Sequence, residues 1–252
     1  MAHFLGQIFL KDTKYIEKIS SCIPAAGRIL VEIGGGKGAI TDILSRRARF
    51  VYCIELDKNL CVFLRKKFKN RNSLKIINAD ILKTDIEKLG DNLIVCGNIP
   101  YYISSELIVY MVFRRSAVEK AYFTVQKEFA RRLTAQPGDE GYGYMSCYIQ
   151  YYAKLKKIFD IPKGAFLPHP KINSSFIEFD FSHRSPLSAE EERVLFEIIQ
   201  KAFSNRRKKV INSLKKDLPV LEQKAKKTDI LNLRPQDLSL EDYIHVLSLC
   251  KE

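Results

Sequence analysis

The sequence predicts an α/β fold, in which a parallel sheet is flanked by crossover helices and followed by a small α-helical domain. Strand-like apolar runs alternate with stretches of helical apolar spacing up to about Leu133, as a parallel sheet requires. A glycine-rich turn follows the first run, Ile29–Val31, where such sheets bring the backbone close to a ligand. After Ser188 the apolar residues keep helical spacing only.

The elements before Leu133 follow from local signals. A first helix begins after Asp12, which can cap it, and its apolar face consists of Tyr15, Ile16, Ile19 and Ile23. A second helix follows the glycine turn, with apolar residues at Ile40, Ile43 and Leu44. The runs that we expect to form buried strands are Ile29–Val31, Phe50–Ile54, Leu74–Ile77, Leu93–Gly97 and Lys120–Val125, and we expect a helix over 126–133.

The later elements are expected to complete the sheet and then form a second domain. Two strand-like stretches, 145–159 and 175–181, have no long crossover helix between them, so we expect them to pair antiparallel at one edge. Residues 137–141 read as a loop and 182–186 as a linker. Ser188 and Glu191 form a capping box before a helix containing Val194, Leu195, Ile198, Ile199 and Ala202. We therefore place one domain at 1–184 and a small α-helical domain at 185–252.

Composition narrows the class of protein. The 252 residues are 46% hydrophobic, as in an ordinary globular core, and the formal net charge of +13 favours attraction to a polyanion. No apolar run approaches the ~18 residues of a membrane span, and we expect no signal peptide. Six scattered cysteines without a Cys-x-x-Cys pair indicate reduced thiols in the cytoplasm. None of the four histidines has metal-ligand spacing, so we expect no metal site.

The glycine-rich turn indicates a nucleotide-like ligand. Residues 32–38 read Glu-Ile-Gly-Gly-Gly-Lys-Gly between a strand and a helix. Glu55 ends the next strand, where it can accept hydrogen bonds from ribose hydroxyls, and Asp80 follows the third strand, where it can meet an adenine edge. Both NAD and S-adenosylmethionine carry an adenosine, but Gly-x-Gly-x-x-Gly and Gly-Lys-Ser/Thr are absent. The alternative interpretation is a plain tight turn.

A second motif, Asn98-Ile99-Pro100-Tyr101, suits a planar base that carries an exocyclic amine. The Asn98 carbonyl can accept from the amine, Pro100 fixes the shape of the loop, and Tyr101 offers a ring for stacking. The alternative is a strand that ends at a proline, with a tyrosine in the core.

Together these motifs resemble a class I S-adenosylmethionine-dependent methyltransferase, and more narrowly the ribosomal RNA small-subunit adenine dimethyltransferase (KsgA) family. Nearly the whole chain takes part. The matching segments are 6–10 (Gly-Gln-Ile-Phe-Leu), 32–38, 98–101, 126–128 with 131–133, 141–143, 165–174 and 203–209. One position departs from the family pattern: Ile8 stands where Asn or His is common, and its apolar side chain cannot make a polar interaction with the cofactor.

The resemblance implies a Rossmann-like class I methyltransferase sheet, mostly parallel with an antiparallel edge strand, and a small C-terminal α-helical domain. It implies that 1–184 is the S-adenosylmethionine-binding catalytic domain and that 185–252 is an RNA-binding domain. It implies S-adenosylmethionine as cofactor, held by Gln7, Ile8, Leu10, Gly34, Gly36, Glu55, Leu56, Asp80, Ile81 and Asn98. The catalytic residues would be Asn98, Ile99, Pro100, Tyr101 and Phe166. Phe166 would be a second aromatic wall opposite Tyr101, although it can also be read as a core residue. His169 is not expected to act as a base, because its neighbours are prolines and methyl transfer to an amine needs no strong base.

The implied activity is dimethylation of the exocyclic amine of two adjacent adenosines near the 3′ end of small-subunit ribosomal RNA, during ribosome biogenesis. The implied partner is that RNA within a pre-ribosomal subunit, and the enzyme would be a cytoplasmic monomer without metal or membrane contact.

Three basic runs, at 65–71, 154–157 and 201–216, are candidates for contacting RNA phosphates. The last lacks acidic residues and contains the best candidates, Arg206, Arg207, Lys208 and Lys209. Each run can also be an ordinary solvated face.

Three other functions remain open on the sequence. A relative that methylates large-subunit ribosomal RNA and confers macrolide resistance shares the Asn-Ile-Pro-Tyr motif, but residues 126–128 and 205–207 look more like the small-subunit enzymes. DNA adenine methyltransferases usually carry two prolines before the aromatic residue. A non-catalytic RNA-binding assembly factor could keep the same fold, although intact Asn98, Tyr101, Glu55 and Asp80 argue against lost catalysis.

Overall fold

The computed structural model describes residues 7–182, 186–215, 221 and 228–250. The chain forms two compact units, 1–130 with 155–182 and 131–154 with 183–252. The predicted domain limit at 184/185 lies outside the described residues, and residues 131–154 join the C-terminal unit rather than the N-terminal one. The assignment of catalysis to one domain and RNA binding to the other stays a prediction.

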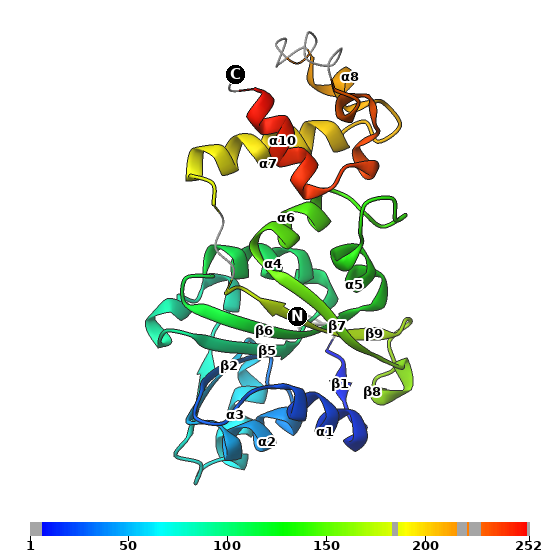
Figure 1. The fold of residues 1–252 in the computed structure, drawn as a ribbon. Coiled ribbons are helices and arrows are strands. Elements are labelled where there is room, and N and C mark those ends of the chain that lie inside the picture. The colour runs from blue at the N-terminus through cyan, green and yellow to red at the C-terminus, as the bar shows by residue number, and fades with distance from the viewer. Residues whose placement is uncertain (1–6, 183–185, 216–220, 222–227, 251–252) are drawn as a thin grey trace. The chain divides into compact units, whose positions relative to one another are not determined.

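The first unit is built on a mostly parallel, seven-stranded sheet with the order β4-β3-β2-β5-β6-β9-β7 (Figure 1). Strands β4, β3, β2, β5 and β6 are mutually parallel, and β9 pairs antiparallel with β6. The strands are β2 (Ile29–Ile33), β3 (Phe50–Glu55), β4 (Leu74–Asn78), β5 (Leu93–Asn98), β6 (Val118–Gln126), β7 (Lys154–Ile161) and β9 (Ser174–Asp180). The five predicted strands before residue 133 are confirmed.

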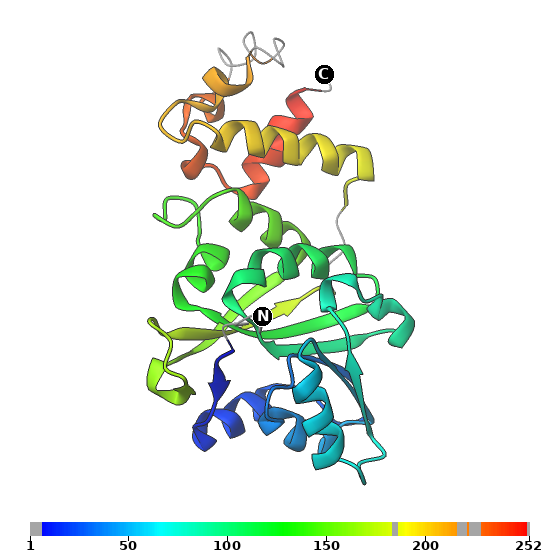
Figure 2. The same cartoon turned by 180° about the vertical axis from the view of Figure 1, so that it is seen from behind.

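Helices cover both faces of this sheet. Figures 1 and 2 show α1 (Thr13–Cys22), α2 (Ala39–Arg47) and α3 (Lys58–Lys67) against one face and α4 (Ser104–Phe113) against the other. Asp12 caps α1 as predicted, because its side chain accepts a hydrogen bond from the backbone N–H of Lys14. Crossover helices on both faces leave the carboxyl ends of β2, β3 and β5 free to form a site.

A short ribbon joins two distant segments beside the sheet. Strand β1 (Phe9–Leu10) pairs antiparallel with β8 (Phe166–Leu167). The backbone N–H groups of Lys11 and Asp12 both donate to the Ala165 carbonyl. The N-terminal motif and the proline-rich segment are therefore held together, although more than 150 residues separate them in the sequence.

The second unit is helical. It contains α6 (Tyr144–Tyr152), α7 (Ala189–Phe203), α8 (Val210–Leu214) and α10 (Leu240–Leu249), while α5 (Lys127–Thr134) spans the change from one unit to the other. The capping box of Ser188 and Glu191 is present at the start of α7 as predicted. No helix of the part of the chain that the structure describes is long and apolar enough to cross a membrane.

The prediction of a strand over 145–159 is wrong in its first half, because 144–152 is helix α6 and only 154–161 is a strand, β7. The reason is tertiary. Tyr144, Tyr148 and Tyr152 recur every four residues, and their rings pack around Phe196 of α7. In a strand, residues four apart would lie about 13 Å from one another, so the three rings could not gather around one side chain.

Candidate active site

A cavity of about 410 Å³ opens at the carboxyl ends of β2, β3 and β5. Eleven of the predicted site residues line it. Those predicted for the cofactor are Gln7, Ile8, Leu10, Gly34, Gly36, Glu55, Leu56 and Asn98, and Ile99, Pro100 and Tyr101 are the further residues predicted for catalysis. The fold therefore brings the glycine turn and the Asn98–Tyr101 motif to one hollow.

The glycine loop is shaped by close packing. Gly36 has a φ of 55°, in the left-handed region that favours glycine, and a Cβ there would lie 3.1 Å from the Phe9 ring. A Cβ on Gly35 would overlap the Cys53 sulfur of β3. A side chain at Gly35 would push the loop away from the sheet and one at Gly36 would press on Phe9, so the glycines allow the backbone to line the cavity.

Glu55 lies at the end of β3 and is only 6% exposed. Its Oε2 accepts from the backbone N–H of Gly36 at 3.0 Å, and its Oε1 accepts from that of Asp57 at 2.9 Å. Asp57 caps α3 and accepts from Gln7 Nε2 at 3.0 Å, a bond that holds the pKa of Asp57 below its usual value. Glu55 thus ties the glycine loop to the start of α3 while its carboxylate lines the cavity.

Glu32, the last acidic residue before the glycines, is 3% exposed and also lines the cavity. Its Oε2 is buried and has no hydrogen-bond partner among the described residues. Burial raises the pKa of Glu32 from 4.5 to about 7. A buried acceptor without a partner at a cavity wall suits a ligand that carries an N–H or ammonium donor.

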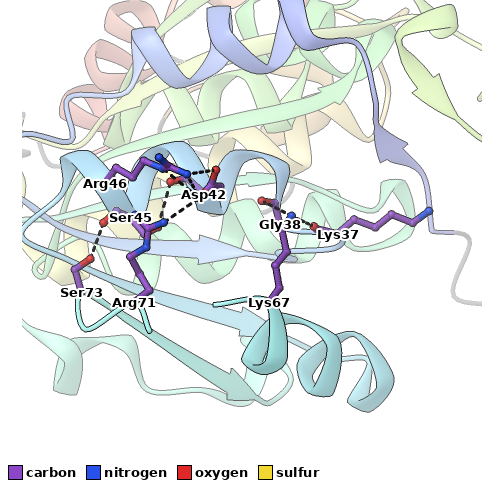
Figure 3. A network of polar contacts seen from close by, with 8 residues as sticks. All are labelled: Lys37, Gly38, Asp42, Ser45, Arg46, Lys67, Arg71 and Ser73. Carbon is purple, nitrogen blue, oxygen red and sulfur yellow. Dashed lines mark hydrogen bonds and ion pairs between the residues drawn. The ribbon is translucent and has the colours of Figure 1, made fainter. Parts of the chain in front are cut away.

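Helix α3 and the turn after it hold the glycine loop and α2 in place (Figure 3). Lys67 Nζ donates to the Lys37 carbonyl at 2.8 Å and approaches the Gly38 carbonyl at 3.5 Å. Arg71 pairs with Asp42 of α2 at 3.1 Å. Ser73 Oγ donates to the Ser45 carbonyl at 2.6 Å. We call these four interactions, made by Lys67, Arg71 and Ser73, the α3 clasp.

The Asn98 amide is oriented by the N-terminal motif. Its Nδ2 donates to the Ile8 carbonyl at 2.9 Å, which makes Oδ1 the acceptor arm of the same amide. Ile8 thus contributes its backbone to the site, and its side chain packs on the core. The unusual apolar residue at position 8 leaves this backbone hydrogen bond intact.

The turn after Asn98 presents Tyr101. Ile99 is buried, and its N–H donates to the Thr124 carbonyl of β6. The Pro100 carbonyl accepts from the Ile103 N–H and from Ser104 Oγ, so it is used inside the turn. The Tyr101 hydroxyl lies 3.0 Å from Ser174 Oγ, and its half-buried ring lines the cavity.

Three predicted residues do not line the cavity. Phe166 is 1% exposed and packs in the core with Tyr122 and Phe176, so the aromatic wall predicted opposite Tyr101 is not formed by Phe166 in this structure. Side chains alternate along a strand, and the neighbouring Leu167, 51% exposed, lines the cavity instead.

Asp80 and Ile81, the other two, follow β4. The Asp80 carboxylate caps a short 3-10 helix by accepting from the Leu82 N–H, and Ile81 is buried.

The four basic residues at 206–209 lie in the second unit, in the turn between α7 and α8. The Arg206 guanidinium donates to the Tyr142 carbonyl at 2.7 Å, so it holds the loop before α6. Lys209 Nζ approaches Asn232 Oδ1 at 3.3 Å. Arg207 and Lys208 are exposed. Of the four predicted residues, Arg206 therefore stabilises a loop, whereas Arg207 and Lys208 face solvent.

A comparison with protein families decides the relationship. The model of the family described as "Ribosomal RNA adenine dimethylase" matches residues 1–251. The chain belongs to this family. Its curated relatives agree: ribosomal RNA small subunit methyltransferase A of Mesomycoplasma hyopneumoniae is 38% identical over 96% of this chain and 93% of that protein. The protein of the same name from Hahella chejuensis is 36% identical over 96% of this chain and 89% of that protein.

Two solved structures share the fold. A dimethyladenosine transferase from Plasmodium falciparum superposes with a TM-score of 0.81 at 26% identity, over 94% of each chain. The 23S rRNA methyltransferase ErmE superposes with a TM-score of 0.80 over 97% of this chain and all of that one. Identity to ErmE is 22%, so that likeness concerns the fold alone.

Sequence reasoning about this dimethylase missed several lining residues. They are Phe9, Lys11, Ile16, Glu32, Gly35, Lys37, Ala39, Ile40, Leu60, Lys67, Tyr102 and Leu167. Glu32 begins the glycine motif and Tyr102 follows Tyr101, so adjacency could have indicated both. Lys67 reaches the loop from a helix 30 residues away, for which the sequence carries no signal.

Proposed function

We propose that this chain is an S-adenosylmethionine-dependent enzyme that dimethylates the exocyclic amine of adenosines in small-subunit ribosomal RNA. The observation that carries the proposal is that the glycine loop and the Asn98–Tyr101 motif line one cavity. A base-holding motif and a nucleotide-type loop in the same hollow allow transfer between two bound molecules. The names of the relatives, at 36–38% identity, support the choice of small-subunit RNA.

The lining of the cavity fits the proposed cofactor. Glu55 presents a carboxylate to ribose hydroxyls, and the unpartnered oxygen of Glu32 suits the ammonium group of the methionine part. Ile8, Ile40 and Leu60 supply apolar surface beside them. When bound, S-adenosylmethionine supplies an electrophilic methyl group on a sulfonium.

The residues of the chain would then prepare the adenine amine. The amine is a poor nucleophile because its lone pair is delocalised into the ring. Asn98 Oδ1 and the Ile99 carbonyl would accept its two N–H groups, which favours a pyramidal nitrogen with an exposed lone pair. Tyr101 would stack on the base and set its plane. Once the nitrogen is methylated its proton becomes acidic and can leave to solvent, so no strong base is needed.

The finer features of the proposal follow the family. The substrate would be two adjacent adenosines near the 3′ end of the RNA, each receiving two methyl groups within a pre-ribosomal subunit. The enzyme would act in the cytoplasm as a monomer and without a metal. An adenosine that is unstacked in the subunit would enter the cavity at a lower cost than one flipped from a duplex.

The proposal is tested by labelled methyl transfer from S-adenosylmethionine into purified ribosomal subunits. We expect transfer into small subunits and not into large ones, with primer extension mapping the product to two adjacent adenosines. Transfer into large subunits alone would favour the macrolide-resistance activity, and transfer into neither would favour a non-catalytic assembly factor.

A substitution at Asn98 tests the proposed chemistry of the amine. Asn98→Ala should lower single-turnover methyl transfer by about a hundredfold, the scale of removing one well-placed polar group, and leave RNA binding nearly unchanged. Calorimetry with S-adenosylmethionine controls for an altered loop, because Asn98 also binds Ile8. Near-normal turnover of the variant would remove Asn98 from the chemistry.

A further inference from the structure

Ser174 lies at the edge of the sheet where the parallel strands end. It is the first residue of β9 and pairs with Gln126 at the end of β6. Strand β9 runs antiparallel to β6, so it begins where β6 and its parallel neighbours finish. The sheet thereby places Ser174 near the carboxyl end of β5, where the Asn98–Tyr101 turn begins.

The Ser174 hydroxyl is directed at the tyrosine of that turn. Its Oγ lies 3.0 Å from the Tyr101 hydroxyl, and Ser174 is fully buried. Tyr101 itself is only half-buried and turns about two side-chain torsions. A hydrogen bond at the far end of the ring, to a group that is fixed by burial, restricts both torsions together.

We propose that Ser174 is a positioning residue for methyl transfer, which fixes the plane of the Tyr101 ring against which the adenine stacks. This inference rests on the function proposed above. The consequence is chemical, because the direction of the amine lone pair depends on the tilt of the base. A tyrosine that turns freely would still bind the base, but the reacting atoms would be aligned less often. Ser174 should therefore affect turnover more than affinity.

Ser175 offers a matched control. It is the next residue, it is fully buried as well, and its hydroxyl also forms a hydrogen bond. Its partner is Asp160 of β7, at 2.6 Å, because alternate side chains of a strand point to opposite faces. Ser175→Ala removes the same atoms from the same strand without touching Tyr101.

The experiment is a double-mutant cycle on the full chain with Ser174→Ala, Tyr101→Phe and the combined variant. Each single change should lower single-turnover methyl transfer into small subunits about 3- to 10-fold, the scale of one neutral hydrogen bond, with little change in KM. The combined variant should be no slower than a single one, because both changes remove the same bond. When Ser175→Ala is combined with Tyr101→Phe, the fold-decreases in methyl transfer of the two single variants should multiply.

Two outcomes would overturn the inference. One is a multiplicative decrease in the Ser174–Tyr101 cycle, and the other is wild-type turnover of Ser174→Ala. The unfolding midpoints of the same variants report on the bond without requiring activity. The changes in midpoint caused by the single substitutions should be non-additive only for the Ser174–Tyr101 pair. If the wild-type protein methylates no subunit while the midpoints remain non-additive, the bond exists but the proposed function fails, and with it the role of Ser174.

Discussion

At the residue scale, two buried carboxylates beside the glycine loop differ in how their oxygens are satisfied. Glu55 receives two backbone N–H donors, from Gly36 and Asp57. Glu32 keeps one buried oxygen without a partner among the described residues. Burial and the unsatisfied oxygen favour the protonated form of Glu32, whose pKa is raised to about 7. Substitution of the two residues should therefore have different effects.

Glu55→Ala should weaken S-adenosylmethionine binding by about 1.5–3 kcal/mol, the range for charge-assisted hydrogen bonds. The decrease would have two sources, since the carboxylate lines the cavity and also accepts from the Gly36 N–H. Isothermal calorimetry on the folded variant measures it, with circular dichroism to verify folding. Unchanged affinity would show that Glu55 does not hold the cofactor.

Glu32→Gln should reduce the pH dependence of stability. The pKa of Glu32 is raised to about 7 in the folded chain from an ordinary 4.5, so the folded state holds the proton more tightly. Its stabilising contribution is complete below about pH 4.5 and is lost as the pH rises to about 7, a change of about 3 kcal/mol. Denaturant unfolding at pH 5 and pH 8 compares the two proteins. Equal differences between the two pH values in wild type and variant would contradict the assignment.

At the scale of elements, the α3 clasp joins a surface helix to the loop that lines the cavity. Lys67, on the last turn of α3, holds the carbonyls of Lys37 and Gly38, and Arg71 holds Asp42 of the following helix α2 (Figure 3). The loop carries several glycines, whose freedom makes ordering an unanchored loop costly in entropy. The clasp should lower that cost by fixing the loop before the ligand arrives.

Lys67→Met should weaken S-adenosylmethionine binding several-fold, because the loop is no longer tied to α3 while the apolar stem of the side chain is kept. Lys66→Met is the control: Lys66 is the exposed preceding residue of the same helix, and the change removes the same charge. Fluorescence or calorimetric titration measures both affinities. Equal effects of the two substitutions would assign the change to net charge rather than to the clasp.

At the scale of the whole molecule, the cations that we expect to contact RNA and the residues that line the cavity belong to different units of the chain. The formal charge of +13 describes the whole chain and does not locate an RNA-binding surface. The exposed Arg207 and Lys208, however, lie in one turn of the helical unit. Arg206 differs from them because it holds the Tyr142 carbonyl, so its removal should affect the packing of that unit. Phosphate contacts position an RNA without reading its sequence, and the cavity near Tyr101 would select the base.

Replacing both Arg207 and Lys208 by Gln should weaken binding of small ribosomal subunits at moderate salt. The log–log dependence of affinity on salt should flatten by about 0.7–0.9 for each RNA phosphate that the variant no longer binds. Arg193→Gln is the control, since Arg193 on α7 is already paired with Glu190 and Glu197. A salt slope that stays at the wild-type value would move the RNA-binding surface to 65–71 or 154–157.

The sequence by itself determined the features that short segments encode. The order of strands and helices up to residue 133, the cap at Asp12, the glycine loop and the Asn98–Tyr101 turn all follow from local backbone preferences and apolar spacing. The motifs also carried the family resemblance, which the match over residues 1–251 confirms. Parallel strands then place their carboxyl ends at one edge, which is why most predicted cofactor residues meet in one cavity.

Only the tertiary structure decided which side of an element faces the site. Phe166 is buried while Leu167 reaches the cavity, because pairing of β8 with β1 fixes which face of that strand points inward. The packing of α6 on Phe196 decided that 144–152 is helical. The hydrogen bonds of Ser174 with Tyr101 and of Lys67 with the glycine loop join residues 73 and 30 positions apart. Such interactions depend on register and packing between distant segments, which local sequence does not encode.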